Sequence, residues 1–244
     1  MLAILKRELK AYFYSPIAYV LIGAFMCISS IFFIAFCVLG LDTEAQIPVA
    51  DIGKVFFNIY MQIFLLLFIP IITMKLFSEE KRNGTEVLLI TSPINITKIV
   101  LGKYLSALIL FLVITALTLI YVIIMFIYGS PYIPSMLGSY LVFILFGALL
   151  LSIGIFVSSL TENQVISVIV SILINSVLFL ISRFGSTLGS FVGNIINSIS
   201  PLSRTKNFSA GIFTLNDIIF FLVAIALFLF FTVRNIEKKR WSKG

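Results

Sequence analysis

Long apolar runs without a charged residue divide the chain. They extend over residues 11–41, 55–74, 104–161, 163–182, 184–203 and 218–233. A helix needs about 20 mostly apolar residues to cross a bilayer, so runs of this length favour membrane-spanning helices. Charged residues make up 11% of the chain and its mean hydropathy is +1.18, whereas soluble domains carry about 25% charged residues. No run shows the alternation typical of membrane strands, so the sequence predicts an all-α integral membrane protein.

The longest run contains more than one span. It is interrupted at residues 129–134, where two prolines and a glycine favour a turn. The run over residues 184–203 is rich in glycine, asparagine and serine, which makes it a poor spanning segment. The sequence therefore predicts six transmembrane helices, at about residues 17–40, 55–76, 99–128, 136–159, 164–183 and 212–233.

The basic residues predict the orientation. Thirteen of the 17 lie in the amino-terminal segment, between the second and third spans, and in the carboxyl-terminal segment. The four on the other side are Lys54, Arg183, Arg204 and Lys206. Short cytoplasmic loops retain basic residues, so both termini are expected in the cytoplasm, with a basic tail over residues 235–244, in a multi-pass protein of the plasma (inner) membrane. The net charge of +7 then indicates contact with anionic membrane lipid rather than nucleic acid.

The first residues have the pattern of an amphipathic helix. Apolar residues fall near one face at Leu2, Leu5, Leu9 and Phe13, and Lys6 and Lys10 fall on another. Ser15-Pro16 then interrupts the helix. We expect residues 1–16 to form an interfacial elbow helix; an ordinary basic flank before the first span is the alternative.

A charged island separates the second and third spans. Eight of the 27 charged residues lie within residues 75–103. Asn83-Gly84 favours a turn with a positive backbone angle, and Thr97 is the expected cap of the third span. The segment over residues 85–90 has the pattern of a short helix with exposed leucines, so it needs a partner or the membrane surface. We favour docking of a partner protein.

Enzyme chemistry is not predicted. Gly102-Lys103 lacks the other residues of a phosphate-binding loop. The chain has no histidine, which excludes histidine-based zinc sites and serine–histidine pairs. No pair of carboxylates falls within a span, and no buried lysine is expected to activate a serine. We therefore expect a protein that is not an enzyme and that binds no cofactor or metal itself.

Polar side chains within the spans form two stripes at helical spacing. Ser167, Ser171 and Asn175 recur every four residues in the fifth span, and Asn58 and Gln62 do so in the second. Hydrogen bonds between helices are one explanation. Lining of a pathway between two subunits is the other.

Glycines recur every four residues after the fifth span, at Gly185, Gly189 and Gly193. Such spacing allows close approach of helix backbones. We expect residues 185–201 to form outer re-entrant helices, which act as a lid over the pathway or serve packing alone.

The charged island resembles a known signature. Its sequence over residues 80–93, EKRNGTEVLLITSP, resembles the E-x-R-x-G-T-x-E-x-L-L-x-T-x-P signature of ABC-2 type transporter permeases, except that Glu86 directly follows Gly84-Thr85. Residues 6–16 are similar to the elbow helix of that family, and residues 158–164 to its short inner loop. The likeness extends over most of the chain and is closest to permeases of gliding-motility and nitrous-oxide-reductase-maturation systems.

This resemblance implies an ABC-2 (type V exporter-like) permease fold and several partners. A separate ABC ATPase subunit would hold ATP and Mg, and a second permease, identical or paralogous, would complete the pathway. Coupling to the ATPase is implied for residues 78–93, in particular Glu79, Glu80, Lys81, Arg82, Gly84, Thr85, Glu86, Leu88, Leu89 and Pro93. The implied function is export of a hydrophobic or amphipathic substrate. The alternative is mechanotransmission of ATPase movement to an extracytoplasmic accessory protein.

Overall fold

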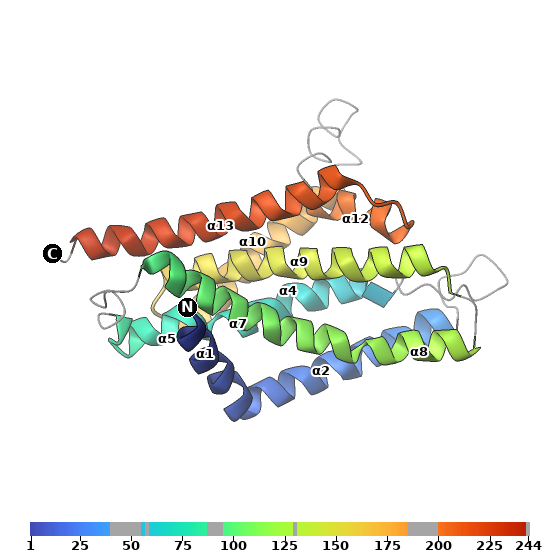
Figure 1. Cartoon of the computed structure of the whole chain (residues 1–244), viewed down its shortest axis with the longest axis horizontal. Coiled ribbons are helices and arrows are strands. Elements are labelled where there is room, and N and C mark those ends of the chain that lie inside the picture. The colour runs from blue at the N-terminus through green and yellow to red at the C-terminus, as the bar shows by residue number, and fades with distance from the viewer. Residues whose placement is uncertain (40–54, 57–58, 87–94, 129–130, 185–199, 243–244) are drawn as a thin grey trace.

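The computed structural model describes residues 1–39, 55–56, 59–86, 95–128, 131–184 and 200–242. Every regular element in these residues is helical (Figure 1). The elements are α1 (Leu2–Tyr14), α2 (Pro16–Phe33), the π-helix η1 (Ile34–Val38), α4 (Ile59–Thr73), α5 (Lys75–Arg82), α7 (Ile96–Leu117), α8 (Leu119–Tyr128), α9 (Ile133–Leu160), α10 (Gln164–Phe184), α12 (Pro201–Ser209) and α13 (Leu215–Ser242). Asn58, Leu88, Leu89, Pro93 and most of the segment over residues 185–201 lie outside the described residues.

Six helical segments are long and apolar enough to cross a membrane. They are Pro16–Val38, Tyr60–Arg82, Ile96–Tyr128, Ile133–Leu160, Gln164–Ile181 and Leu215–Lys238. This confirms the predicted all-α class with six transmembrane helices. The last helix differs in length from the expected sixth span, because α13 continues to Ser242. Arg234 and Glu237, one turn apart, form an ion pair at 3.3 Å in this extension.

Short polar residues set the starts of two helices. Ser15 caps α2, and its hydroxyl accepts from the Ile17 amide at 3.4 Å. Asn95 caps α7, since its side chain accepts from the Thr97 amide at 3.1 Å. The prediction that Thr97 is the cap is therefore wrong. Asn and Thr are both capping residues, and the structure places the earlier one in the extended conformation that a cap requires.

Two of the spans are interrupted within the bundle. α4 contains Pro70, which cannot donate a backbone hydrogen bond, and the chain turns at Met74 before α5 begins. α7 gives way to α8 at Thr118, where the Tyr140 hydroxyl donates to the Thr118 carbonyl at 3.0 Å. A side chain of α9 enters the backbone hydrogen bonding at each break. The Ser158 hydroxyl accepts from the Phe77 and Ser78 amides and donates to the Met74 carbonyl, and the Tyr140 hydroxyl binds the Thr118 carbonyl.

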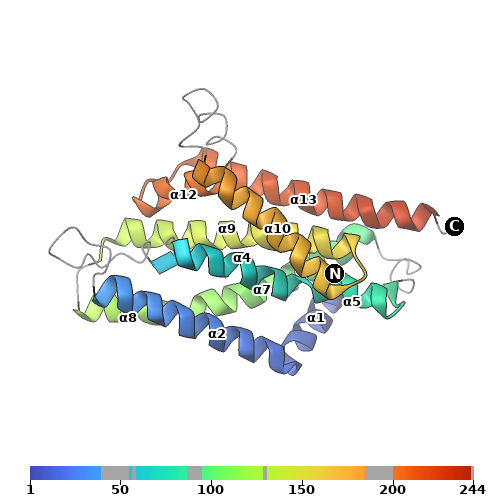
Figure 2. The ribbon, with the colours of Figure 1, turned by 180° about the vertical axis from the view of Figure 1, so that it is seen from behind.

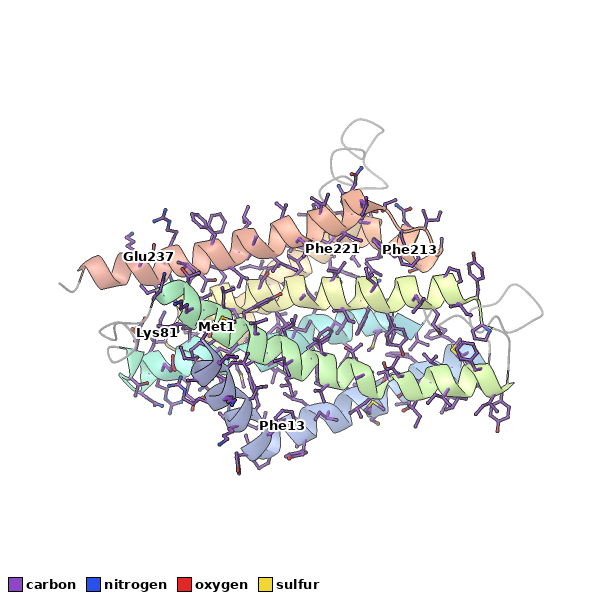
Figure 3. All side chains as sticks on the ribbon, viewed as in Figure 1. Met1, Phe13, Lys81, Phe213, Phe221 and Glu237 are labelled. Atoms are coloured by element: carbon purple, nitrogen blue, oxygen red, sulfur yellow. The ribbon has the colours of Figure 1, made fainter. Side chains whose placement is uncertain are left out.

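α9 is the central helix. It packs against α4, α5, α7, α10, α12 and α13, and the view from behind shows α10 and α4 crossing one side of it (Figure 2). Within its most apolar window 78% of residues are buried, against 22% for both α10 and α13. Side chains fill the space between the helices (Figure 3). The outer helices therefore present apolar faces to the membrane, while α9 is surrounded by protein.

Glycines of α9 permit close contacts with neighbouring helices. A Cβ atom on Gly147 would lie 2.3 Å from the Phe111 ring of α7, and one on Gly154 would lie 2.2 Å from the Thr73 hydroxyl of α4. Both distances are shorter than any van der Waals contact. The absence of side chains at these positions is therefore what brings α7 and α4 against α9.

The two termini lie toward one end of the bundle together with α5 (Figure 1). Met1, Lys81 and Glu237 are near this end, and Phe213 is at the other (Figure 3). We call the end near Met1, Lys81 and Glu237 the α5 end, and the end near Phe213 the α12 end. Because an even number of helices crosses the bundle, both termini return to the same side.

We expect Gly147→Ala to destabilise the protein by about 1–3 kcal/mol, because the new methyl group overlaps the buried Phe111 ring. Thermal unfolding of the purified chain measures the effect. Gly23→Ala is the matched control, since a Cβ there meets nothing within 4 Å. That control should be neutral or slightly stabilising, and equal unfolding temperatures for the two variants would contradict the packing argument.

Candidate functional site

Helix α5 carries the first part of the charged island. It follows α4 after a turn at Met74 and buries Leu76, Phe77, Ser78 and Lys81. It ends at Arg82, and the next residues form a turn in which Gly84 has φ of +69°. The turn predicted at Asn83-Gly84 is thus confirmed, and glycine suits it because other residues rarely adopt this conformation. Residues 82–85 are exposed at the tip of α5.

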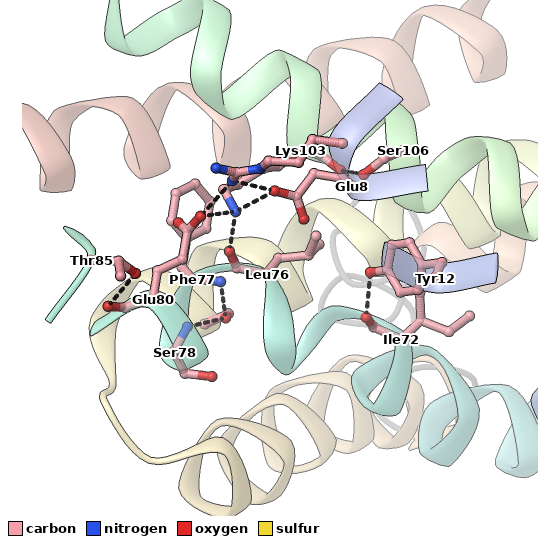
Figure 4. A network of polar contacts seen from close by, with 12 residues as sticks. Glu8, Tyr12, Ile72, Leu76, Phe77, Ser78, Glu80, Thr85, Lys103 and Ser106 are labelled. Carbon is pink, nitrogen blue, oxygen red and sulfur yellow. Dashed lines mark hydrogen bonds and ion pairs between the residues drawn. The ribbon is translucent and has the colours of Figure 1, made fainter. Parts of the chain in front are cut away.

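A cluster of four charged side chains holds α5 against two other helices. Lys103 of α7 lies 3.2 Å from Glu8 of α1 and 3.0 Å from Glu80 of α5 (Figure 4). Arg7 of α1 lies 2.6 Å from Glu8 and 2.7 Å from Glu80. We call these four residues the ion-pair cluster. It connects α1, α5 and α7 through side chains that are far apart in the sequence.

Burial makes Lys103 the centre of this cluster. Its side chain is 1% exposed, and its ammonium also donates to the Leu76 carbonyl at 2.5 Å. A buried ammonium is tolerated only when it is paired and hydrogen-bonded, and three oxygens meet that need here. The aromatic ring of Phe77 lies 5.1 Å from the same nitrogen, close enough for a cation–π contact.

Two other groups on α1 have raised pKa values. A hydrogen bond to Glu8, supported by the charges of Glu8 and Glu80, raises the pKa of Arg7 above its ordinary value. The Tyr12 hydroxyl donates to the Ile72 carbonyl at 2.8 Å, and its burial raises the pKa of that phenol. Both groups therefore keep their usual protonation state at neutral pH while they join α1 to its neighbours.

A second set of contacts joins α5 to α9, and α9 in turn to α13. The Ser158 hydroxyl of α9 accepts from the Phe77 and Ser78 amides, each at 3.2 Å. The Lys81 ammonium donates to the Ser159 carbonyl, which also accepts from the Asn235 side chain of α13 at 2.9 Å. We call these contacts the serine joint. They place the Ser158-Ser159 pair, noted in the sequence as part of an inner loop, inside the last turn of α9.

The residues expected to couple to an ATPase divide into two groups. Glu80 and Lys81 are engaged within the chain, as described above. Glu79 is half-buried and accepts from Gln164 at 3.4 Å. The members with exposed side chains or backbone are Arg82, Gly84 and Thr85, and Glu86 is intermediate. Among the described members of this set, the surface that remains open to a partner is therefore residues 82–86 at the tip of α5.

One expectation about lysine was wrong. Lys103 is 1% exposed and Lys81 is 8% exposed, although no buried lysine was expected. The physical reason is that carboxylates and carbonyls from other helices satisfy both ammonium groups. Ser106 lies on the same helix as Lys103 but forms no serine–lysine dyad with it. The Ser106 hydroxyl donates to the backbone carbonyl of Lys103 at 2.7 Å.

The polar stripe of the fifth span faces the interior of this chain. Ser167, Ser171 and Asn175 are each 1% exposed, and Gln62 of α4 is 9% exposed. Among the described residues, the Ser167 hydroxyl and both polar atoms of the Asn175 side chain have no hydrogen-bond partner. The stripe thus lies within the bundle, and its role in lining a pathway stays a prediction.

Sequence reasoning missed an ion pair at the α12 end. Arg204 of α12 lies 2.6 Å from Asp217 in the first turn of α13. Asn207 donates to the same carboxylate at 3.2 Å, and Thr214 donates to it as well. The pairing of Glu8 with Lys103 in the ion-pair cluster was also missed. A lone charge in an amphipathic or interfacial segment gives no sign of its partner until the helices are placed.

Comparison with protein families decides the class of the chain. A family model described as ABC-2 type transporter matches residues 1–213. The chain belongs to the ABC-2 type transporter family. No curated protein matches it. The match confirms the family resemblance of the signature over residues 80–93 and covers the ion-pair cluster; the finer likeness to gliding-motility and nitrous-oxide-maturation permeases stays a prediction.

Family membership and the six apolar helices together establish a coarse function. The chain is a multi-pass membrane permease subunit of an ABC-2 transporter, a transport component rather than an enzyme. The family implies an ABC ATPase partner in general. The α5 end is the candidate for the site where that partner acts, because residues 80–86, the described part of the signature, lie there.

We expect Lys103→Met to destabilise the chain by about 3 kcal/mol, because Glu8 and Glu80 lose the buried cation between them. Thermal or denaturant unfolding in detergent measures this. Lys98→Met is the control, since Lys98 is exposed on the same helix. Adding Glu80→Gln to Lys103→Met should recover part of the loss, and an unaltered stability of the single variant would show that the cluster contributes nothing.

Proposed function

We propose that this chain is the permease subunit of an ATP-driven ABC-2 exporter for a hydrophobic or amphipathic substrate. It would pair with a second permease, identical or paralogous, and each permease would receive a separate ATPase subunit that holds ATP and Mg. The α5 end would face the cytoplasm of a cell whose plasma (inner) membrane holds the chain. The observation that carries the proposal is the attachment of α5 to α1, α7 and α9 beneath an exposed tip.

The attachment supports force transmission from the tip of α5. Glu80 joins α5 to α1 and α7 through the ion-pair cluster. Ser158 and Ser159 join it to α9, and Asn235 extends that joint to α13. A partner that displaces residues 82–86 would therefore move α5 together with helices at both sides of the bundle. A loop tethered only by its backbone could not do this.

The packing of the bundle supports a pathway between two chains. α9 occupies the centre of the described helices and is surrounded by protein. The ring of Phe143 in α9 is fully buried, as are those of Phe25 and Phe111, whose centroids lie 6.3 and 5.6 Å from it. A pathway through the middle of one chain would require their displacement. A second permease that packs against an outer apolar face supplies a wall for the pathway without this cost.

We expect replacement of both Leu88 and Leu89 by Asp to abolish the stimulation of ATP hydrolysis by the permease while the chain still inserts. Charged side chains cannot fill an apolar groove on the ATPase, and buried apolar anchors usually dominate such interfaces. The measurement is ATP hydrolysis by the coexpressed complex in proteoliposomes. Replacement of both leucines by Ile is the control, and full stimulation in the Asp variant would count against docking through this segment.

Copurification of the tagged chain distinguishes export from mechanotransmission. An exporter should retain an ATPase and a small hydrophobic or amphipathic molecule. Mechanotransmission predicts an ATPase together with an extracytoplasmic protein and no retained cargo. A chain that retains no ATPase under conditions that preserve membrane complexes would remove support from both.

We expect Asn83→Cys, in a chain with Cys27→Ser and Cys37→Ser, to react with a membrane-impermeant maleimide only from the cytoplasmic side. Residue 83 is exposed at the tip of α5. Tyr132→Cys is the matched probe of the other end, since Tyr132 is 66% exposed. Intact spheroplasts and inverted vesicles supply the two orientations. Labelling of residue 83 in intact spheroplasts would place the tip of α5 outside the cell and would refute the proposed topology.

A further inference from the structure

A cavity of about 390 Å³ lies at the α5 end beside the ion-pair cluster. α1 and the start of α2 form one wall, and the end of α4 and α5 form the other. Ile17 and Ala18 are at the beginning of the first span, and Lys75 and Glu79 are near the end of the second. The cavity therefore lies on one side of the membrane, where the first span begins and the second span ends. Lipid head groups occupy this level of a membrane protein.

The lining of the cavity is apolar on one side. Ala18 and Leu21 of α2 face Ile71 of α4 and Leu76 at the start of α5. Leu21 and Leu76 are buried, as is Ala18. This side suits hydrocarbon rather than an ion.

The other side of the lining is charged with both signs. Lys75 and Glu79 lie four residues apart on α5, a spacing that places Cβ atoms about 5–6 Å apart. No ion pair joins Lys75 to a carboxylate among the described residues. Glu79 has only the long hydrogen bond from Gln164 at 3.4 Å. The two charges are thus both available to a ligand.

Glu80 also lines the cavity. One of its carboxylate oxygens pairs with Arg7 and Lys103. The other oxygen is buried without a hydrogen-bond partner among the described residues. Since this second oxygen is closed off from solvent, Glu80 adds negative charge to the wall rather than a direct contact with a ligand.

We propose that this cavity binds the head group of a phospholipid that carries both a phosphate and a primary ammonium, the phosphoethanolamine type. Lys75 receives the phosphate, Glu79 receives the ammonium beside the negative charge of Glu80, and the apolar wall holds the start of the acyl chains. The inference goes beyond the proposed export function, because the lipid would bind the permease itself rather than be transported. Its binding would require no ATPase. The same head-group chemistry occurs in free phosphoethanolamine, which the test separates from the lipid.

Native mass spectrometry of the purified full chain tests the proposal with short-chain phosphatidylethanolamine, phosphatidylcholine and phosphatidylglycerol. Phosphatidylethanolamine should bind about tenfold more tightly than phosphatidylcholine, whose quaternary ammonium has no N–H to donate, the change that one hydrogen bond to a charged group produces. Phosphatidylglycerol should bind more weakly too, since it lacks a cation. Free phosphoethanolamine should bind far more weakly than the lipid.

Variants separate this cavity from general adhesion of lipid. Lys75→Met and Glu79→Gln should each remove the preference for phosphatidylethanolamine. Ala11→Trp should abolish binding, because Ala11 lines the cavity. Ala3→Trp, at an exposed position of the same helix, should leave binding intact.

Four outcomes would overturn the proposal. Equal binding of phosphatidylethanolamine and phosphatidylcholine would refute hydrogen bonding by the ammonium, and equal binding of phosphatidylglycerol would refute recognition of the cation. A preference that survives in Lys75→Met and Glu79→Gln would place the lipid elsewhere. Free phosphoethanolamine binding as tightly as the lipid would assign the cavity to a soluble ligand. None of these outcomes bears on coupling to an ATPase, which the substitutions at Leu88 and Leu89 test separately.

Discussion

The buried charge of Lys103 is the constraint on which the α5 end depends. An ammonium that is 1% exposed is stable only with anionic and carbonyl oxygens around it. Glu8 and Glu80 supply the anionic oxygens, and they come from two other helices, α1 and α5. The requirement to pair one cation therefore constrains the relative positions of α1, α5 and α7, at the end of the bundle that carries residues 80–86 of the family signature.

The central helix α9 connects the α5 end to the rest of the bundle. Glycines at its contacts let α7 and α4 approach closely, and Ser158 and Ser159 at its end bind α5. α5 is thereby held both to the peripheral α1 and to the helix at the core. Its exposed tip at residues 82–85 is the part that remains open to a partner. A helix held at several points with an open tip is the arrangement that the proposed transmission of ATPase movement would require.

The sequence was informative where a single residue or run determines its own conformation. The six spans follow from apolar length alone, and the turn at Gly84 follows from the freedom of glycine to take a positive φ. The cap of α7 was placed two residues late, because Asn95 and Thr97 are both able to accept from a backbone amide. The stripe containing Asn175 was recognised by its spacing, but spacing does not say whether a polar face turns toward its own bundle or toward another subunit.

The sequence by itself therefore determined the helical class, the number of spans and the family, since each depends on residue types that are near one another in the chain. Only the tertiary structure decided that Glu8 meets Lys103, that Lys81 reaches Ser159 instead of solvent, and that Lys75 and Glu79 line a cavity against α1. These are relations between helices. They depend on how the interhelical contacts of apolar side chains and glycines place each backbone, and no local pattern encodes that placement.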